Sequence, residues 1–145
     1  SFEAYNNRSA TYNQLSEYDL ALEDLNESIL INAMNPDAYH NRGAAHAGRG
    51  QPEEAIENYT EAVRLSSITH IGLDPQLYKT YFNLGLTYSH LGQYERAIED
   101  FDEAIRLNPQ SAIAYNNRGV AYERLGKTRE AELDYQKAKE LGYDP

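Results

Sequence analysis

The chain has 145 residues and no cysteine, and its 23 Asp and Glu against 13 Lys and Arg give a net charge of −10. This length allows one domain of ordinary size. An acidic chain without a basic cluster does not favour binding to nucleic acid or to anionic membranes, and a chain without cysteine has no disulfide or thiolate metal site. No apolar run resembles a signal peptide or reaches the roughly 18 residues of a membrane span, so we expect a cytoplasmic protein without membrane insertion.

The sequence repeats itself four times. The string Tyr-x-Asn-(Arg/Leu)-(Gly/Ser) begins at Tyr5, Tyr39, Tyr81 and Tyr115, at intervals of 34, 42 and 34 residues. The agreement extends through the residues that follow each string, including a small residue at Ser16, Gly50, Gly92 and Gly126 and an alanine at Ala21, Ala55, Ala97 and Ala131. The chain therefore divides into repeats at 2–35, 36–69, 78–111 and 112–145, with an insertion at 70–77.

Each repeat is predicted to form two helices. Apolar and aromatic residues recur at spacings of three and four before and after a break such as Gly92. Pro36, Pro52 and Pro75 stand where a first helical residue is expected. Pro75 lies six residues before Tyr81, so the first helix of the third repeat should begin about one turn early. The rest of the insertion should lengthen the preceding helix or form a surface loop within 66–73.

A 34-residue helix–turn–helix unit with this pattern resembles the tetratricopeptide repeat. The third repeat matches best, with Tyr81, Gly85, Tyr88, Gly92, Ala97, Phe101, Ala104 and Pro109. The resemblance implies an all-α fold, a right-handed α-α solenoid of stacked helix–turn–helix repeats that forms a single domain over 1–145. Arg8, Arg42 and Arg118 occupy a position usually held by Leu. We interpret them as covering the stack with their apolar stems while their charges stay in solvent.

The sequence does not carry a pattern typical of catalysis. It has no phosphate-binding Gly-rich loop and no nucleophile elbow. The four histidines, His40, His46, His70 and His90, do not have the spacing of a metal site, and His46 is expected to be packed or half-buried. Carboxylate runs such as 99–103 are interpreted as solvated outer faces of second helices. We expect no enzyme activity, no metal and no cofactor.

The charge divides unevenly between the two helices of each repeat. The first 14 residues of the four repeats carry six Lys or Arg against three acidic residues, so the rest of the chain carries −13. In the family, first helices line a concave surface, and the resemblance therefore implies a neutral-to-basic groove within an acidic shell. The expected function is a protein interaction module, an adaptor or scaffold that binds an extended peptide segment of a partner protein.

The resemblance also implies which residues line this groove. They are Asn6, Ala10 and Asn13 in the first repeat, His40 and Ala44 in the second, Lys79, Phe82, Leu86 and His90 in the third, and Ile113, Asn116, Val120 and Arg124 in the fourth. Each repeat adds an asparagine two residues after its leading tyrosine: Asn7, Asn41, Asn83 and Asn117. Side-chain amides can pair with the N–H and C=O of an extended peptide, although the same asparagines can instead brace the neighbouring helix.

Two other functions stay open at this point. The chain can be a scaffold that assembles into homo-oligomers through the ends of its solenoid, or the recruiting segment of a larger enzyme or regulator. Glu132 and Lys139 replace residues that are apolar in the other repeats, which predicts that the array ends with the fourth repeat and that any missing part lies on the N-terminal side. Of the five clamp positions with which family members hold carboxylate tails of chaperones, only Asn41 and Lys79 match, so we expect no useful affinity for such tails.

Overall fold

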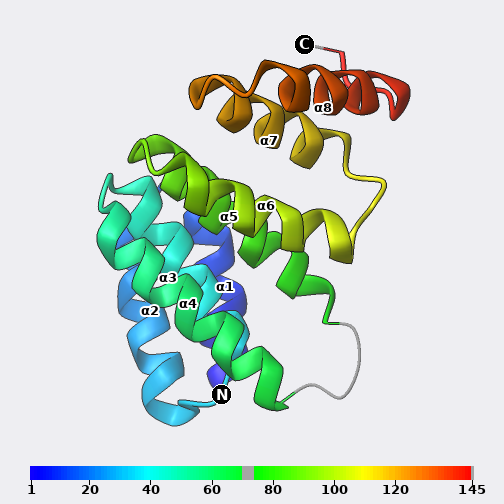
Figure 1. The fold of residues 1–145 in the computed structure, drawn as a ribbon. Helices are drawn as coiled ribbons and strands as arrows, with labels where there is room; N and C mark the ends of the chain where they lie inside the picture. Colours follow the sequence, from blue (N-terminus) through cyan, green and yellow to red (C-terminus); the bar gives the residue numbers. More distant parts are fainter. Residues whose placement is uncertain (70–73, 145) are drawn as a thin grey trace. The chain divides into compact units, whose positions relative to one another are not determined.

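A computed structural model describes residues 1–69 and 74–144, and within them the chain forms eight helices and no strand (Figure 1). The helices pair as the repeats predict: α1 (Phe2–Gln14) with α2 (Tyr18–Ile31), α3 (Pro36–Gly48) with α4 (Pro52–Thr69), α5 (Pro75–His90) with α6 (Tyr94–Leu107), and α7 (Ala112–Arg124) with α8 (Thr128–Glu140). The predicted all-α class and the two helices in each repeat are confirmed.

Local sequence signals account for most helix ends. Proline is the first residue of α3, α4 and α5, where its missing N–H costs no hydrogen bond. The turns inside the second, third and fourth repeats contain Gly50, Gly92 and Gly126 with φ between 71° and 73°, a conformation that favours glycine. The first repeat has Ser16 at the same place, and Ser16 adopts a φ of 60°.

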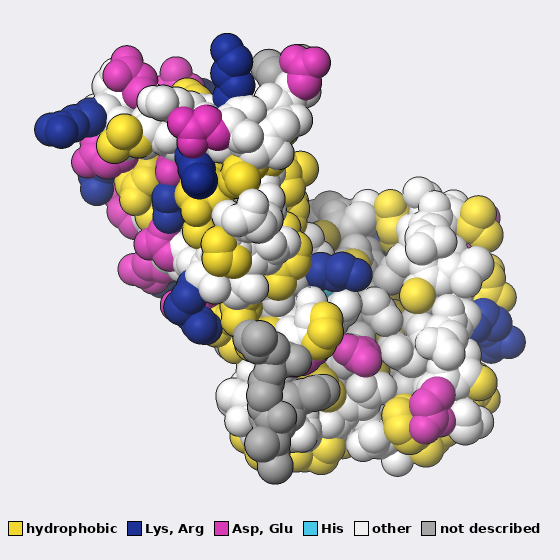
Figure 2. All heavy atoms as spheres, turned by 90° about the vertical axis from the view of Figure 1, so that its right-hand side faces the viewer, with side chains coloured by type: hydrophobic (Ala, Val, Ile, Leu, Met, Phe, Trp, Pro, Cys, Tyr) yellow, Lys and Arg dark blue, Asp and Glu magenta, His cyan; other side chains and the backbone are white. Residues whose placement is uncertain are grey.

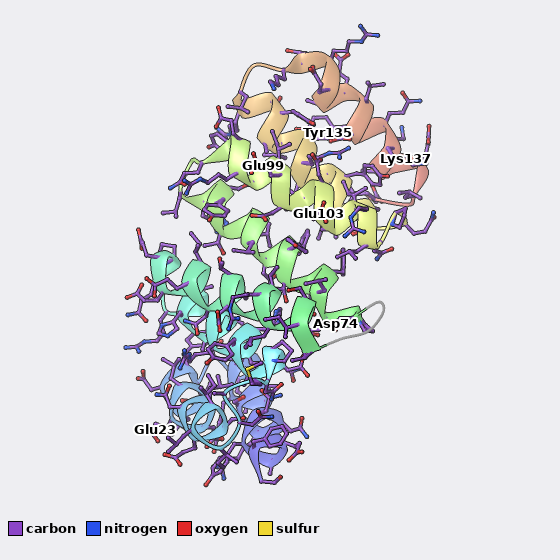
Figure 3. All side chains as sticks on the ribbon, turned by 60° about the horizontal axis from the view of Figure 1, so that its bottom comes forward. Glu23, Asp74, Glu99, Glu103, Tyr135 and Lys137 are labelled. Carbon is purple, nitrogen blue, oxygen red and sulfur yellow. The ribbon has the colours of Figure 1, made fainter. Side chains whose placement is uncertain are left out.

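The insertion lengthens both helices that flank it. Helix α4 has 18 residues and α5 has 16, whereas the other helices have 13 or 14. Asp74 caps α5, because its Oδ1 accepts a hydrogen bond of 2.9 Å from the backbone N–H of Gln76, and its Oδ2 accepts one from the Ser66 hydroxyl on α4 (Figure 3). The predicted early start of α5 and lengthening of α4 are confirmed, while 70–73 lie outside the described residues.

The chain separates into two compact units, Ser1–Gln76 and Leu77–Pro145. The first has a core cluster of Ala21, Leu25, Ala38 and Ala45, and the second one of Ala97, Ile98, Phe101 and Ala121. Each unit contains two repeats, and in each the second repeat packs against the first. That all four repeats form a single domain stays a prediction.

Small residues set the distance between the two helices of a repeat. A Cβ added to Gly85 on α5 would lie 2.6 Å from the ring of Phe101 on α6, closer than packed carbon atoms approach. Gly43 faces Tyr59 and Gly119 faces Tyr135 in the same way. In each of these three repeats, the aromatic ring of the second helix therefore lies directly on the backbone of the first helix at the glycine. This contact fixes the register between the two helices.

Candidate peptide-binding site

Arginines on three of the first helices bind residues of the second helix in the same repeat. Arg118 donates from Nε and Nη2 to the two carboxylate oxygens of Asp134, at 2.8 and 2.6 Å. Arg8 makes the same pair of bonds to Asp24, both at 2.6 Å. In the second repeat Arg42 donates from Nε to Asn58 at 2.6 Å. We call each of these an arginine bridge; its two residues stand 16 apart in the sequence.

Two arginine bridges also reach back to the preceding repeat. Nη1 of Arg42 donates to Asn26 at 3.1 Å, and Nη1 of Arg118 donates to Asp102 at 2.7 Å. The Arg118 side chain is only 19% exposed, and charge-assisted hydrogen bonds of this geometry are the strong ones. The interpretation that these charges stay in solvent is wrong for Arg118, because the carboxylates of buried Asp134 and of exposed Asp102 replace water around its guanidinium.

The third repeat lacks an arginine bridge. Leu84, which is 4% exposed, stands where the other repeats have Arg. Asp100 occupies the position of Asp24 and Asp134 without an arginine 16 residues before it. Desolvation by burial, followed by the nearby charges of Glu99 and Glu103, raises the pKa of Asp100 from 3.8 to about 7. The prediction of a fully solvated carboxylate run is therefore wrong for this residue.

In the first unit, several predicted groove residues are bound to one another. Asn41 on α3 donates from Nδ2 to Oδ1 of Asn6 on α1, and Asn13 on α1 donates from Nδ2 to the backbone oxygen of Asn41, both at 2.9 Å. These bonds brace α1 against α3. His40 is 6% exposed, with its ring 5.5 Å from the ring of Tyr59, so its side chain does not present itself to a ligand.

Other residues of the first unit remain accessible. Asn7 is exposed, and Ala10 and Ala44 are half-buried.

Among the described side chains, Oδ1 of Asn13 is buried without a hydrogen-bond partner. His46 is half-buried as predicted, and its Nδ1 lies 3.0 Å from Oε1 of Gln51.

In the second unit, the predicted residues form a more accessible surface. Lys79, His90 and Arg124 are exposed, and Ile113 is 48% exposed. The structure thus brings cationic and apolar groups onto α5 and α7 of one unit.

Phe82 and Leu86 on α5 are half-buried and pack against the core cluster of the second unit. Val120 on α7 is also half-buried. The Phe82 ring lies 5.9 Å from that of Phe101 and 6.2 Å from that of Tyr78. These side chains therefore support the core and expose only part of their area.

The two asparagines of this surface have unused hydrogen-bonding capacity. Asn83 is half-buried, and its side chain makes no hydrogen bond within the described part of the chain. Asn117 donates from Nδ2 to the backbone oxygen of Ile113 at 2.9 Å, which leaves its Oδ1 as an acceptor. The bracing role of these asparagines is thus observed at Asn41, while Asn83 keeps both its donor and its acceptor.

A hollow of about 450 Å³ lies beside Asn116, between α7, α8 and the residues after α8. Asn116, Tyr135, Lys139, Tyr143 and Asp144 line it. The Tyr135 hydroxyl donates to Glu123 at 2.9 Å, and desolvation together with this carboxylate raises the pKa of Tyr135 to about 12 (Figure 3). Of these residues only Asn116 was predicted from sequence, because the pattern of the family's first helices does not include α8.

The second helices carry much of the negative charge. Figure 3 shows Glu23 on α2 and Glu99 and Glu103 on α6, and around the top of Figure 2, where α7 and α8 lie, acidic side chains are mixed with Lys and Arg. Within residues 1–69 and 74–144, no three His, Asp or Glu side chains group as metal ligands would. Every helix in this part of the chain is too short or too polar to cross a bilayer.

Sequence models of the tetratricopeptide repeat match residues 34–110 and 82–145, and a further repeat model matches 10–50. The first of these matches spans more than half of the chain. The chain belongs to the tetratricopeptide repeat family. The family models that match describe repeats, and none names an enzyme.

Curated relatives extend this family assignment. The chain is 40% identical over 79 residues to heat shock protein STI1 of Saccharomyces cerevisiae, a match over 52% of this chain and 13% of that protein. It is 37% identical over 59 residues to small glutamine-rich tetratricopeptide repeat-containing protein 2 of the same yeast, over 41% of this chain and 17% of that protein. The chain thus spans less than a fifth of the length of these two relatives.

Solved structures confirm the helical solenoid fold. MamA superposes with a TM-score of 0.86 at 26% identity, over 97% of this chain and 78% of MamA. BtubC from P. vanneervenii superposes with a TM-score of 0.87 over 99% of this chain and 66% of BtubC, at 20% identity. This tetratricopeptide chain therefore has the architecture of a family of protein interaction modules.

Proposed function

We propose that this chain is a non-catalytic adaptor that holds an extended segment of a partner protein on its first helices. Membership of the tetratricopeptide repeat family supports a role in protein–protein interaction. The observation that carries the finer proposal is Asn83, a partly exposed amide without a hydrogen-bond partner in the described residues. An amide offers a donor and an acceptor to a peptide backbone, whatever the side chains of that peptide are.

The face of α5 and α7 in the second unit is the stronger candidate for this contact. Asn83 and Asn117 supply amide groups there, and the exposed part of Ile113 supplies apolar area. Lys79 and Arg124 add positive charge in a chain of net charge −10, which favours peptide segments with acidic residues. In the first unit, a hydrogen bond to Asn6 occupies the side chain of Asn41, one of the two amides at the corresponding positions, while the other, Asn7, is exposed.

The proposal is tested with peptides selected on the full chain from a random library. The affinity of a selected peptide is measured by calorimetry, and amide hydrogen exchange locates its contacts. The double variant Asn83→Ala with Asn117→Ala should bind about 1–3 kcal/mol more weakly, the range for leaving buried polar groups unpaired. Helical signal and melting midpoint should not change.

A matched control uses Glu99→Gln, a change of an exposed side chain on the second helix α6, which should leave peptide affinity within about twofold, as expected for a rim charge. Protection from exchange should concentrate in α5 and α7. Unaltered affinity of the asparagine variant, or affinity lost only together with the fold, would contradict the proposal.

A further inference from the structure

The arginine of the second repeat is held by neutral side chains. Nε of Arg42 donates to Oδ1 of Asn58 at 2.6 Å, and its Nη1 donates to Oδ1 of Asn26 at 3.1 Å. In the fourth repeat, the equivalent bonds of Arg118 end on carboxylates, those of Asp134 and Asp102. A guanidinium stays charged at neutral pH, so the second repeat holds a cation between two amides where the fourth repeat holds one between two anions.

The positive charge of Arg42 is partly removed from water without a counterion. Arg42 is half-buried. Desolvation by burial lowers the pKa of Arg42, and no Asp or Glu among the described residues acts against this effect. In the first repeat, by contrast, the hydrogen bonds to Asp24 raise the pKa of Arg8. A half-buried cation that lacks a carboxylate is unfavourable by itself, and an anion from solvent would supply the missing charge.

One nitrogen of Arg42 is left without a partner because an amide has a single oxygen. Asp134 accepts from both Nε and Nη2 of Arg118. Asn58 accepts from Nε of Arg42 alone, and its own Nδ2 donates to the backbone oxygen of Glu54 at 2.8 Å. Nη2 of Arg42 therefore makes no hydrogen bond within residues 1–69 and 74–144, and it does not belong to the buried atoms that lack a partner there. This nitrogen is accessible to a ligand.

A second free donor lies beside the guanidinium. Asn26 on α2 is exposed, and while its Oδ1 accepts from Arg42, its Nδ2 makes no hydrogen bond in the described part of the chain. On α3, the Cζ atom of Arg42 lies 5.2 Å from the centre of the Tyr39 ring, a contact that holds the guanidinium in place. Two neighbouring N–H donors, one of them charged, match the oxygens of a carboxylate or phosphate group.

We propose that Arg42 and Asn26 form a binding site for one oxyanion group, a carboxylate or a phosphate. Nη2 of Arg42 and Nδ2 of Asn26 donate to the oxygens of this group, which supplies the negative charge that Asp102 and Asp134 supply in the fourth repeat. The site belongs to α2 and α3 of the first unit. It is separate from the peptide-binding face of α5 and α7 and does not depend on it.

The site is tested by nuclear magnetic resonance on the full chain, with side-chain N–H signals as the readout. The chain is titrated with sodium acetate and, in a separate series, with inorganic phosphate, while sodium chloride keeps the ionic strength constant. The Nε–H signal of Arg42 and the Nδ2–H signals of Asn26 should shift together and saturate. The Nε–H signal of Arg118, which is already paired with two carboxylates, should not shift. The anion that saturates the signals at the lower concentration identifies the group that the site prefers.

A variant fills the site from within the chain. Asn26→Asp gives Arg42 the carboxylate that Asp102 gives Arg118, and it should weaken anion binding about tenfold or more. The matched control Gln110→Glu adds the same charge at an exposed position of the second unit and should leave the affinity unaltered.

A loss of fold does not end the test. Should Asn26→Asp lose helical signal, Asn26→Ala takes its place; it removes one donor and should weaken binding about threefold to tenfold. The proposal is overturned if neither anion gives a saturable shift, if Arg118 shifts as much as Arg42, or if the folded Asn26 variant binds as tightly as the unmodified chain.

Discussion

Replacing Asp100 by Asn is expected to stabilise the protein at pH 8. Asp100 is partly buried on α6 beside Glu99 and Glu103, and it lacks the arginine that Asp134 has at the same position of the fourth repeat. Its pKa is raised from 3.8 to about 7, so the folded state holds a proton that the unfolded state has released between these two values. The contribution of Asp100 to the free energy of unfolding therefore falls as pH rises from about 4 to about 7 and is constant above that range. The amide side chain of the Asp100→Asn variant does not ionise, so the variant does not lose this part of the free energy of unfolding as pH rises.

The magnitude follows from the pKa difference and the exposure of the side chain. The full difference between 3.8 and about 7 corresponds to about 4 kcal/mol. Asp100 is only partly buried, and solvent screens the charges of its neighbours, which reduces the expected gain to about 1–2 kcal/mol. For a chain of this length, that gain raises the melting midpoint by about 2–8 °C.

The assay is thermal and urea unfolding followed by circular dichroism at pH 4.5, 6 and 8. The advantage of Asp100→Asn over the unmodified chain should grow from pH 4.5 to pH 8. The matched variant Asp134→Asn should destabilise the chain at pH 8, because it removes the charge from an arginine bridge. An Asp100→Asn chain that is less stable at pH 8, or whose advantage is the same at all three values, would refute the reasoning.

Three further predictions concern the turn, the arginine bridges and carboxylate tails. Ser16→Gly should raise the free energy of unfolding by about 1 kcal/mol in urea titrations, because Ser16 adopts a φ of 60° that glycine tolerates better; an unchanged midpoint would contradict this. Arg118→Ala should cost about 3 kcal/mol, since it leaves the buried carboxylate of Asp134 unpaired, and Arg8→Ala should cost clearly less because this arginine is more exposed, so that water reaches the carboxylate it leaves. An acidic chaperone tail peptide should show no binding at micromolar concentration by calorimetry, because only Asn41 and Lys79 match the clamp positions of the family; micromolar affinity would disprove this.

Much of the fold could be predicted because its signals are local. The position of Pro36, Pro52 and Pro75 predicts where three helices begin, and the structure confirms each start. The interval of 42 residues between Tyr39 and Tyr81 locates the insertion, and α4 and α5 are lengthened on either side of it. Periodicity and turn residues act over one or two helical turns, so they can be interpreted without knowing what packs against them.

The candidate site was less predictable, since its properties depend on partners distant in the sequence. His40 fits the pattern of groove residues, yet it lies buried against Tyr59, 19 positions later. Asn41 and Asn83 occupy the same position of their repeats, but the side chain of Asn41 donates a hydrogen bond to Asn6, whereas that of Asn83 makes none within the described residues.

The sequence by itself determined the four repeats, their register and their helix pairs, because each is encoded in a 34-residue pattern of apolar, small and turn residues. Only the tertiary structure decided the state of the charged groups. Arg118 is held between Asp102 and Asp134, while Arg8 bonds only to Asp24 within the described residues, and Asp100 has its pKa raised. Burial and pairing are properties of three-dimensional contacts, and the cost of desolvating a charge depends on which groups the fold places around it.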